Sequence, residues 1–182
     1  MLSSQTTDQM TSKAMSNLLK YGLTIENLLT AEKEEVKSMI SSVGFANRKT
    51  EYICKVAEIL KHQYNSDIPD NIDELVKLPG VGPKMAYLAM QCAWSNCQGI
   101  GVDVHVHRIA NRLCWTGKYK TSTPEQTRIA LENNIPKNKW SEINKLLVGF
   151  GQTVCKSSKP LCSQCPLSST CPYLNPDIKD MF

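Results

Sequence analysis

The sequence of 182 residues contains no apolar run approaching the roughly 20 residues that a helix needs to span a bilayer. Its first residues have neither the apolar core of a signal peptide nor an Arg-rich amphipathic stretch. It contains no internal repeat, no low-complexity tract and no sustained alternation of apolar and polar residues. These absences argue against a membrane protein, a repeat array and a β-rich fold.

The composition is that of an ordinary globular protein. Hydrophobic residues make up 41% and charged residues 21% of the chain, and the net charge is +4. This mild basic excess is compatible with a polyanionic partner but does not identify one.

Helical periodicity dominates what is present. Between residues 47 and 63 the apolar side chains form one face, and we expect Lys49, Glu51, Lys55, Glu58 and Lys61 to lie around it. A similar pattern runs from Trp140 to Phe150. Glycine and proline separate further predicted helices at about 7–20, 32–42, 71–77, 83–95, 102–114 and 123–134. The sequence therefore predicts an all-α fold.

Eight cysteines are many for this length, and half of them crowd into one segment. Cys155, Cys162, Cys165 and Cys171 lie in a stretch with little apolar material, which needs another cross-link to hold a shape. Four thiolates at this spacing suit either tetrahedral zinc or a [4Fe–4S] cluster, and the spacing alone leaves both open. Because no export signal is visible, we expect a reducing compartment rather than disulfides.

The segment Leu78-Pro79-Gly80-Val81-Gly82-Pro83-Lys84 lies between two predicted helices. Its glycines allow a tight turn, and a proline at the first helical position costs no hydrogen bond. The exposed amides of Gly80, Val81 and Gly82 would suit a phosphate, which is the helix–hairpin–helix pattern of sequence-independent DNA binders. An ordinary corner between two helices is the alternative.

Lys84 and Asp103 are the candidate catalytic pair. An ammonium at a helix start opposes the positive end of the macrodipole, which favours the neutral, nucleophilic amine. Taken alone, a lysine in the position of Lys84 is more often a phosphate-contacting or solvated lysine than a nucleophile. Asp103 precedes a periodic segment and is also a candidate N-cap, a geometry that would fix where its carboxylate points.

These motifs, together with residues 2–8, 43–45, 102–112 and 147–152, make nearly the whole chain resemble the endonuclease III family, in particular its eukaryotic members. The resemblance implies a bifunctional DNA N-glycosylase and AP lyase of base excision repair that removes oxidised pyrimidines. It implies a monomer acting on double-stranded DNA with oxidised pyrimidines or abasic sites, away from membranes, in the nucleus and also in the mitochondrion. It also implies that the four cysteines hold [4Fe–4S] rather than zinc.

The resemblance assigns roles to individual residues. Lys84 becomes the nucleophile that forms a Schiff base, and Asp103 becomes its essential partner. The other assignments are Gln5 and Phe45 in the gap left by a flipped nucleotide, Asp8 and His105 in the lesion pocket, and Lys156 and Lys159 on DNA phosphates. Without the resemblance, these would be read as a polar residue at a helix start, a core phenylalanine, a structural histidine and solvated lysines.

The architecture implied by the resemblance has two helical lobes. Residues 1–96 would form a six-helix lobe with the hairpin motif at about 72–95, and residues 97–182 a second lobe with the cluster loop at 155–171. DNA would lie between the lobes and bring Lys84 and Asp103 together. The chain starts at the motif beginning with Leu2, before which family members ordinarily carry a further helix. A non-catalytic DNA-binding module with a structural metal, and a glycosylase for mismatched bases or a purine lesion, remain alternatives.

Overall fold

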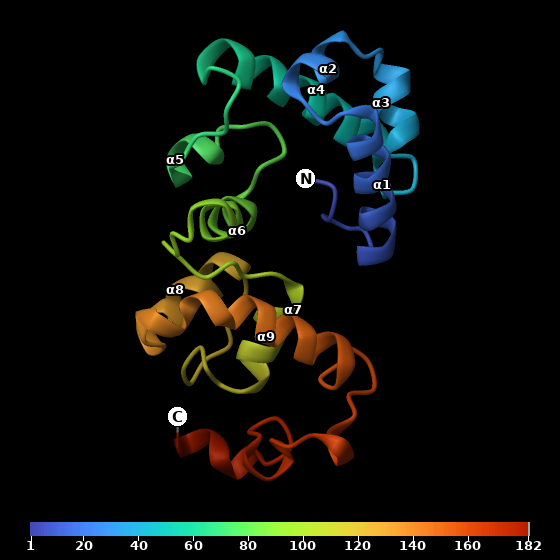
Figure 1. Ribbon diagram of the computed structural model, residues 1–182. Coiled ribbons are helices and arrows are strands. Elements are labelled where there is room, and N and C mark those ends of the chain that lie inside the picture. Colours follow the sequence, from blue (N-terminus) through green and yellow to red (C-terminus); the bar gives the residue numbers. More distant parts are fainter. Residues whose placement is uncertain (182) are drawn as a thin grey trace. The chain divides into compact units, whose positions relative to one another are not determined.

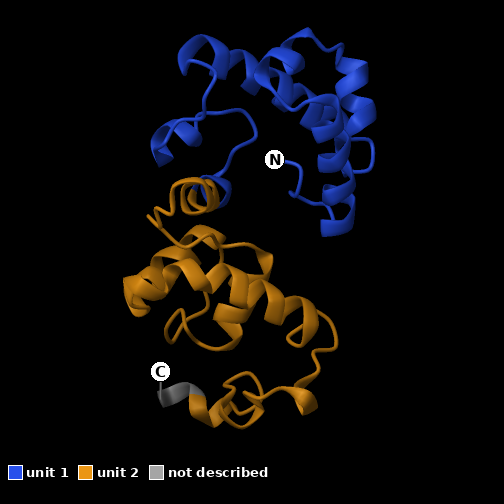
Figure 2. Ribbon diagram, viewed as in Figure 1, with its two compact units in different colours: residues 1–86 blue, residues 87–182 orange. Residues whose placement is uncertain are grey.

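The computed structural model describes residues 1–181, with side chains up to residue 178, and every regular element in that range is helical (Figure 1). The predicted all-α fold is therefore confirmed. The chain forms two compact units, one of residues 1–86 and one beginning at Tyr87 (Figure 2). The division between Ala86 and Tyr87 falls inside one helix rather than in a loop.

The helices predicted from the sequence are all present, with ends that differ by a few residues. The first unit contains α1 (Asp8–Tyr21), α2 (Ile25–Thr30), α3 (Lys33–Met39), α4 (Ala46–Gln63), α5 (Ile72–Leu75) and the start of α6 (Pro83–Trp94). The second contains the rest of α6, then α7 (Val104–Arg112), α8 (Pro124–Asn134), η1 (Lys137–Lys139), α9 (Trp140–Thr153), η2 (Cys162–Gln164), η3 (Ser168–Thr170) and η4 (Pro176–Met181). Helix α2 was not predicted, because its 6 residues are too few to show a period.

Side-chain caps explain where several helices begin. The side chains of Thr7, Thr24, Asn71 and Thr123 each accept a hydrogen bond from the backbone N–H three residues later, at 2.9–3.4 Å. Each such cap is worth about 1 kcal/mol because it satisfies an amide that has no partner inside the helix. Helix α1 ends at Gly22, whose φ of 93° is the left-handed conformation typical of a glycine C-cap.

The core of the first unit lies between α1, α3 and α4. Helix α4 packs against both α2 and α3, and α3 also packs against α1 (Figure 1). The buried residues of this core are Ala14, Leu18, Val36, Ile40, Val43, Ile53 and Cys54. This packing fixes the loops that precede α1 and α4, which carry two of the predicted DNA-contacting residues.

The core of the second unit is built around α7, which packs against α8 and α9. Its buried residues are Ile100, Val102, Val106, Ile109, Ala110, Leu113, Leu131, Ile143 and Leu147. Helices α7 and α9 approach closely at Gly151, where an added Cβ would lie 2.6 Å from the His105 Nδ1 atom. None of the helices in the described part of the chain is long and apolar enough to cross a bilayer.

Candidate functional site

The hairpin between α5 and α6 depends on one glycine. Gly80 has a φ of +79°, and a Cβ added there would lie 2.4 Å from the Cδ2 atom of Tyr52 on α4. The turn is closed by the Val81 N–H, which donates to the Leu78 carbonyl at 3.0 Å. Gly82 differs, because a Cβ added there meets nothing within 4 Å. Only Gly80 therefore needs glycine for both its backbone conformation and its space.

Lys84 is the second residue of α6 and its side chain is exposed. The Gly82 carbonyl accepts from the Ala86 N–H at 3.0 Å, so the helix begins directly at the turn. The Lys84 side chain thus leaves from the first turn, near the positive end of the helix dipole, where the sequence predicts it. Lys84 belongs to the first unit and Asp103 to the second, and their pairing stays a prediction.

Asp103 is the N-cap of α7. Its Oδ1 atom accepts hydrogen bonds from the His105 and Val106 backbone amides, both at 2.9 Å. The residue is half-buried. Capping therefore holds the carboxylate in a fixed orientation, which is the arrangement that the sequence allowed for a residue with both roles.

Gln5, Phe45 and Gly80 line one pocket of the first unit, together with Arg48 and Tyr52 among others. Gln5 and Phe45 both adopt left-handed backbone conformations, with φ of 52° and 59°. Phe45 is 65% exposed, so it is not a core phenylalanine. The structure thus brings the two predicted gap-filling residues together beside the hairpin turn.

The burial of Lys49 shows that its predicted position on the solvated side of α4 was wrong. We expected it among the solvated residues around the apolar face, but it is only 5% exposed. It precedes Ile53, Val56 and Leu60 by 4, 7 and 11 residues, a spacing that places it on the buried face. Its Nζ atom donates to the Leu2 carbonyl at 2.7 Å, the Ser4 carbonyl at 2.6 Å and Thr6 Oγ1 at 2.9 Å. These acceptors compensate the burial of its charge, and that burial lowers the pKa of Lys49.

Cys155, Cys162, Cys165 and Cys171 line a single small pocket of the second unit, which also has Phe150, Leu161 and Leu167 in its wall. The four are free thiols. Within the described residues, no three Cys, His, Asp or Glu side chains converge closely enough to hold a single metal ion. The four cysteines therefore surround one common space.

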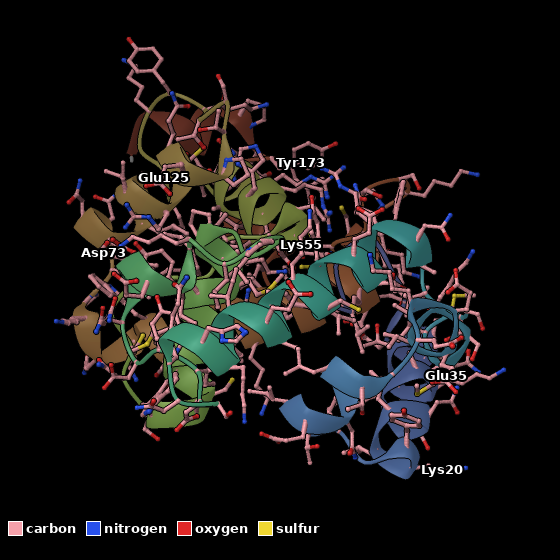
Figure 3. The ribbon with its side chains drawn as sticks, turned by 90° about the horizontal axis from the view of Figure 1, so that it is seen from above. Lys20, Glu35, Lys55, Asp73, Glu125 and Tyr173 are labelled. Carbon is pink, nitrogen blue, oxygen red and sulfur yellow. The ribbon has the colours of Figure 1, made fainter. Side chains whose placement is uncertain are left out.

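Arg112, at the end of α7, anchors the segment that carries the cysteines. Its guanidinium donates to Cys155 Sγ at 3.3 Å, to the Lys156 carbonyl at 2.7 Å and to the Ser157 carbonyl at 3.0 Å. It also lies 4.8 Å from the centroid of the Tyr173 ring, which is labelled in Figure 3. These contacts join the cysteine segment to the helix that Asp103 caps.

The remaining predicted residues are not among those that line the pocket of Gln5 and Phe45. Asp8 is the exposed first residue of α1 and lines a shallow hollow along that helix. His105 is half-buried, and its Nδ1 atom lies 3.2 Å from the guanidinium of Arg108. Lys156 and Lys159 are both exposed on the loop that Arg112 anchors. For these four residues the assigned roles stay predictions.

Lys49 and Arg112 are the two residues of these sites that the sequence analysis missed. A lysine at the spacing of a buried helix face was a usable signal for Lys49. Arg112 gave no comparable signal, because an arginine at the end of a helix is ordinarily explained by the helix dipole.

Comparison with known proteins gives consistent similarities. The family described as "HhH-GPD superfamily base excision DNA repair protein" matches residues 1–137. "Endonuclease III-like protein 1" of Gallus gallus is 52% identical over 172 residues, covering 94% of this chain and 61% of that protein. The "Endonuclease III homolog" of Encephalitozoon cuniculi is 40% identical over 185 residues, covering 94% of this chain and 75% of that protein.

Among solved structures, a trapped endonuclease III–DNA covalent intermediate, an estranged-adenine complex, matches with a TM-score of 0.89 and 32% identity. That match covers 97% of this chain and 82% of the other. A thermostable thymine-DNA glycosylase matches with a TM-score of 0.85 and 25% identity, covering 96% and 81%. The chain spans less than two thirds of the vertebrate relatives it matches, 61% of the Gallus gallus protein and 57% of the Mus musculus one.

Proposed function

Because the chain belongs to the HhH-GPD superfamily of base excision DNA repair proteins, and within it to the endonuclease III family, we propose that it is a bifunctional DNA N-glycosylase and AP lyase. Its substrates would be oxidised pyrimidines of the thymine glycol type, and abasic sites, in double-stranded DNA. It would act as a monomer in the nucleus, with the mitochondrion as a second location.

The observation that carries this proposal is the position of Lys84 in the first turn of α6, directly after the glycine turn. Backbone amides at a helix start suit a DNA phosphate, so a bound strand would pass close to the lysine. The same helix end favours the neutral amine, which is the nucleophilic form. A DNA-binding module without catalysis would use a lysine here in its charged form, to contact a phosphate, and would gain nothing from the neutral amine.

The proposed reaction starts with extrusion of the damaged nucleotide, because C1′ is inaccessible in the stack. The Lys84 amine attacks C1′ as the bond between C1′ and the base breaks, and the base leaves with the electron pair and takes up a proton. Opening of the sugar ring then gives a protonated Schiff base between Nζ and C1′. Loss of a proton from C2′ expels the 3′ phosphate by β-elimination, and water releases the lysine.

Asp103 would stabilise the positive charge that builds on the sugar as the base departs, and would help to deprotonate Lys84. Its two backbone hydrogen bonds at the start of α7 hold the carboxylate still, so little reorganisation is needed during the reaction. Gln5 and Phe45 would fill the gap that the extruded nucleotide leaves. The pocket that they share with Gly80 supports this role.

For the four cysteines we propose a [4Fe–4S] cluster. All four line one pocket, which supports a shared ligand, and four cysteine thiolates are the ligand set of such a cluster. Membership of the endonuclease III family favours iron–sulfur over zinc. Bound there, the cluster would cross-link a segment that has little apolar core of its own. The measurement is iron, sulfide and zinc content of the purified protein; one zinc per chain and no iron would refute the cluster.

Borohydride trapping on a thymine glycol duplex tests the enzyme proposal directly. We expect a covalent protein–DNA band from the wild type and none from Lys84→Gln, whose amide forms no Schiff base. Lys20→Gln is the matched control, because Lys20 is an exposed lysine in the last turn of α1 (Figure 3). If the folded wild-type protein binds the duplex but gives no trapped band, the non-catalytic DNA-binding module would be favoured.

The substrate class has its own test. Parallel assays would use duplexes that carry thymine glycol, 8-oxoguanine or a G·T mismatch. We expect base release from thymine glycol to be the fastest. Release from only the mismatch or the purine lesion would replace the proposed substrate while leaving the enzyme class intact.

A further inference from the structure

Lys49 is a buried cation whose three hydrogen-bond donors are all used by one short segment. An ammonium has three N–H donors, and those of Lys49 reach Leu2 O, Ser4 O and Thr6 Oγ1 at 2.6–2.9 Å. Hydrogen bonds to a charged group are among the strong ones. Two of the acceptors precede Gln5 and one follows it, so the lysine holds the loop on both sides of Gln5.

The segment that Lys49 binds is also in contact with the loop that carries Phe45. Thr6 Oγ1 accepts from the Gly44 N–H at 3.2 Å, and a Cβ added at Gly44 would lie 2.8 Å from the Gln5 carbonyl oxygen. The two loops are thus in direct contact next to the residues at their tips. Lys49 itself lies in the first turn of α4, the helix that Phe45 precedes.

Both tips are strained. Gln5 and Phe45 have φ of 52° and 59°, left-handed conformations that residues with a side chain rarely adopt. Such conformations persist only where surrounding contacts hold them. Lys49 is the residue whose contacts surround Gln5, and its helix begins at Phe45.

We propose that Lys49 is the positioning residue for the two gap-filling side chains: its ammonium clamps the Gln5 loop against the start of α4, so that Gln5 and Phe45 enter the duplex together. This inference rests on the proposed function. The clamp prepares the enzyme for duplex DNA and takes no part in the chemistry at C1′. Its loss would therefore weaken duplex binding and nucleotide extrusion while leaving the Schiff-base step intact.

The test compares duplex DNA with a substrate that needs no gap filling. Lys49→Met keeps the chain length but removes the donors, Lys49→Arg restores charged donors, and Lys55→Met is the control. Lys55 lies on the same helix and is exposed (Figure 3). The substrates are a duplex and a single-stranded oligonucleotide that each contain one abasic site. Affinity is measured by fluorescence anisotropy, and KM and kcat by strand cleavage.

For Lys49→Met we expect the Kd and KM for the abasic duplex to rise about tenfold, with kcat and all single-strand values within about twofold of wild type. Lys49→Arg should recover part of the loss, and Lys55→Met should match the wild type. A parallel loss on both substrates, or no loss on the duplex, would overturn the positioning role.

Thr6→Val is a second test of the proposal, for the case that the Lys49→Met protein does not fold. It removes one acceptor and the link to Gly44 while the Leu2 and Ser4 carbonyls keep their bonds to Lys49. We expect about a threefold, duplex-specific rise in Kd, and its absence would count against the clamp. If the wild type cleaves neither substrate, the proposed activity fails, and the affinity comparison still decides the role of Lys49.

Discussion

Replacing Gly80 with alanine tests how the hairpin is built. The residue combines a left-handed φ of +79° with direct contact to the Tyr52 ring, at distances of 2.4–3.0 Å from an added Cβ. A methyl group at this position must therefore adopt a disfavoured backbone conformation and displace an aromatic ring. Gly82, two residues later, has open space around its Cα and serves as the matched control.

The expected cost follows from these two terms. The left-handed conformation costs an alanine about 1–2 kcal/mol, and overpacking against a ring costs about 1–3 kcal/mol. Lower entropy of the unfolded chain returns about 0.4–1 kcal/mol, which leaves a net loss of about 2–3 kcal/mol. For a chain of this size that corresponds to a fall in Tm of about 5–10 °C. Gly82→Ala loses the better N-cap residue of α6 and should cost less than about 1 kcal/mol.

Urea denaturation and thermal unfolding, followed by circular dichroism, measure both variants. Repeating Gly80→Ala in a Tyr52→Ala background separates the two costs, because without the ring only the backbone cost less the entropy gain, about 0.5–1 kcal/mol, should remain. Equal stabilities of Gly80→Ala and Gly82→Ala would refute the reasoning. So would a full Gly80→Ala penalty in the absence of Tyr52.

Three further outcomes follow from the structure. Gly151→Ala should destabilise the second unit by about 1–3 kcal/mol, because its Cβ would overlap the His105 ring. Gly149→Ala on the same helix, where an added Cβ meets nothing within 4 Å, should instead stabilise it by about 0.5–1 kcal/mol. The Tm values of the two variants test this contrast. Asp103→Asn should keep the cap and the Tm but lose the proposed glycosylase activity, whereas Asp103→Ala should also lose about 1 kcal/mol of unfolding free energy. The Lys77 ammonium lowers the pKa of Glu74, so their bond stabilises the fold above the ordinary carboxyl pKa and is lost as the pH falls through the lowered pKa. In urea titrations against pH, Glu74→Gln should therefore differ from wild type at neutral pH and converge with it in acid.

The helices were predictable because most of them are amphipathic, and a period of 3.6 residues is visible in the sequence alone. The prediction failed where that signal is short or mixed. Helix α2 has 6 residues and none of them is buried. Lys49 was placed by its charge, although its spacing fits the buried face, because only the folded chain reveals the oxygens that satisfy its ammonium.

The candidate site was predictable to the extent that it is local. The turn glycines, Lys84 and the cap at Asp103 belong to short motifs whose chemistry follows from the chain itself. The shared pocket of Gln5, Phe45 and Gly80 depends instead on how α1, α4 and α6 are placed, which no local pattern contains. The anchoring of the cysteine segment by Arg112 likewise joins residues far apart in the sequence.

At Phe45, the left-handed backbone makes the residue that is best for folding stability different from the residue that is best for the proposed gap-filling role. A glycine there would relieve about 1–2 kcal/mol of conformational strain, of which the greater entropy of the unfolded chain offsets about 0.4–1 kcal/mol. Any engineering effort that selects only for heat resistance would favour that exchange. It would also delete one of the two proposed gap-filling side chains, so the most thermostable variants at this position should be the poorest at opening a duplex.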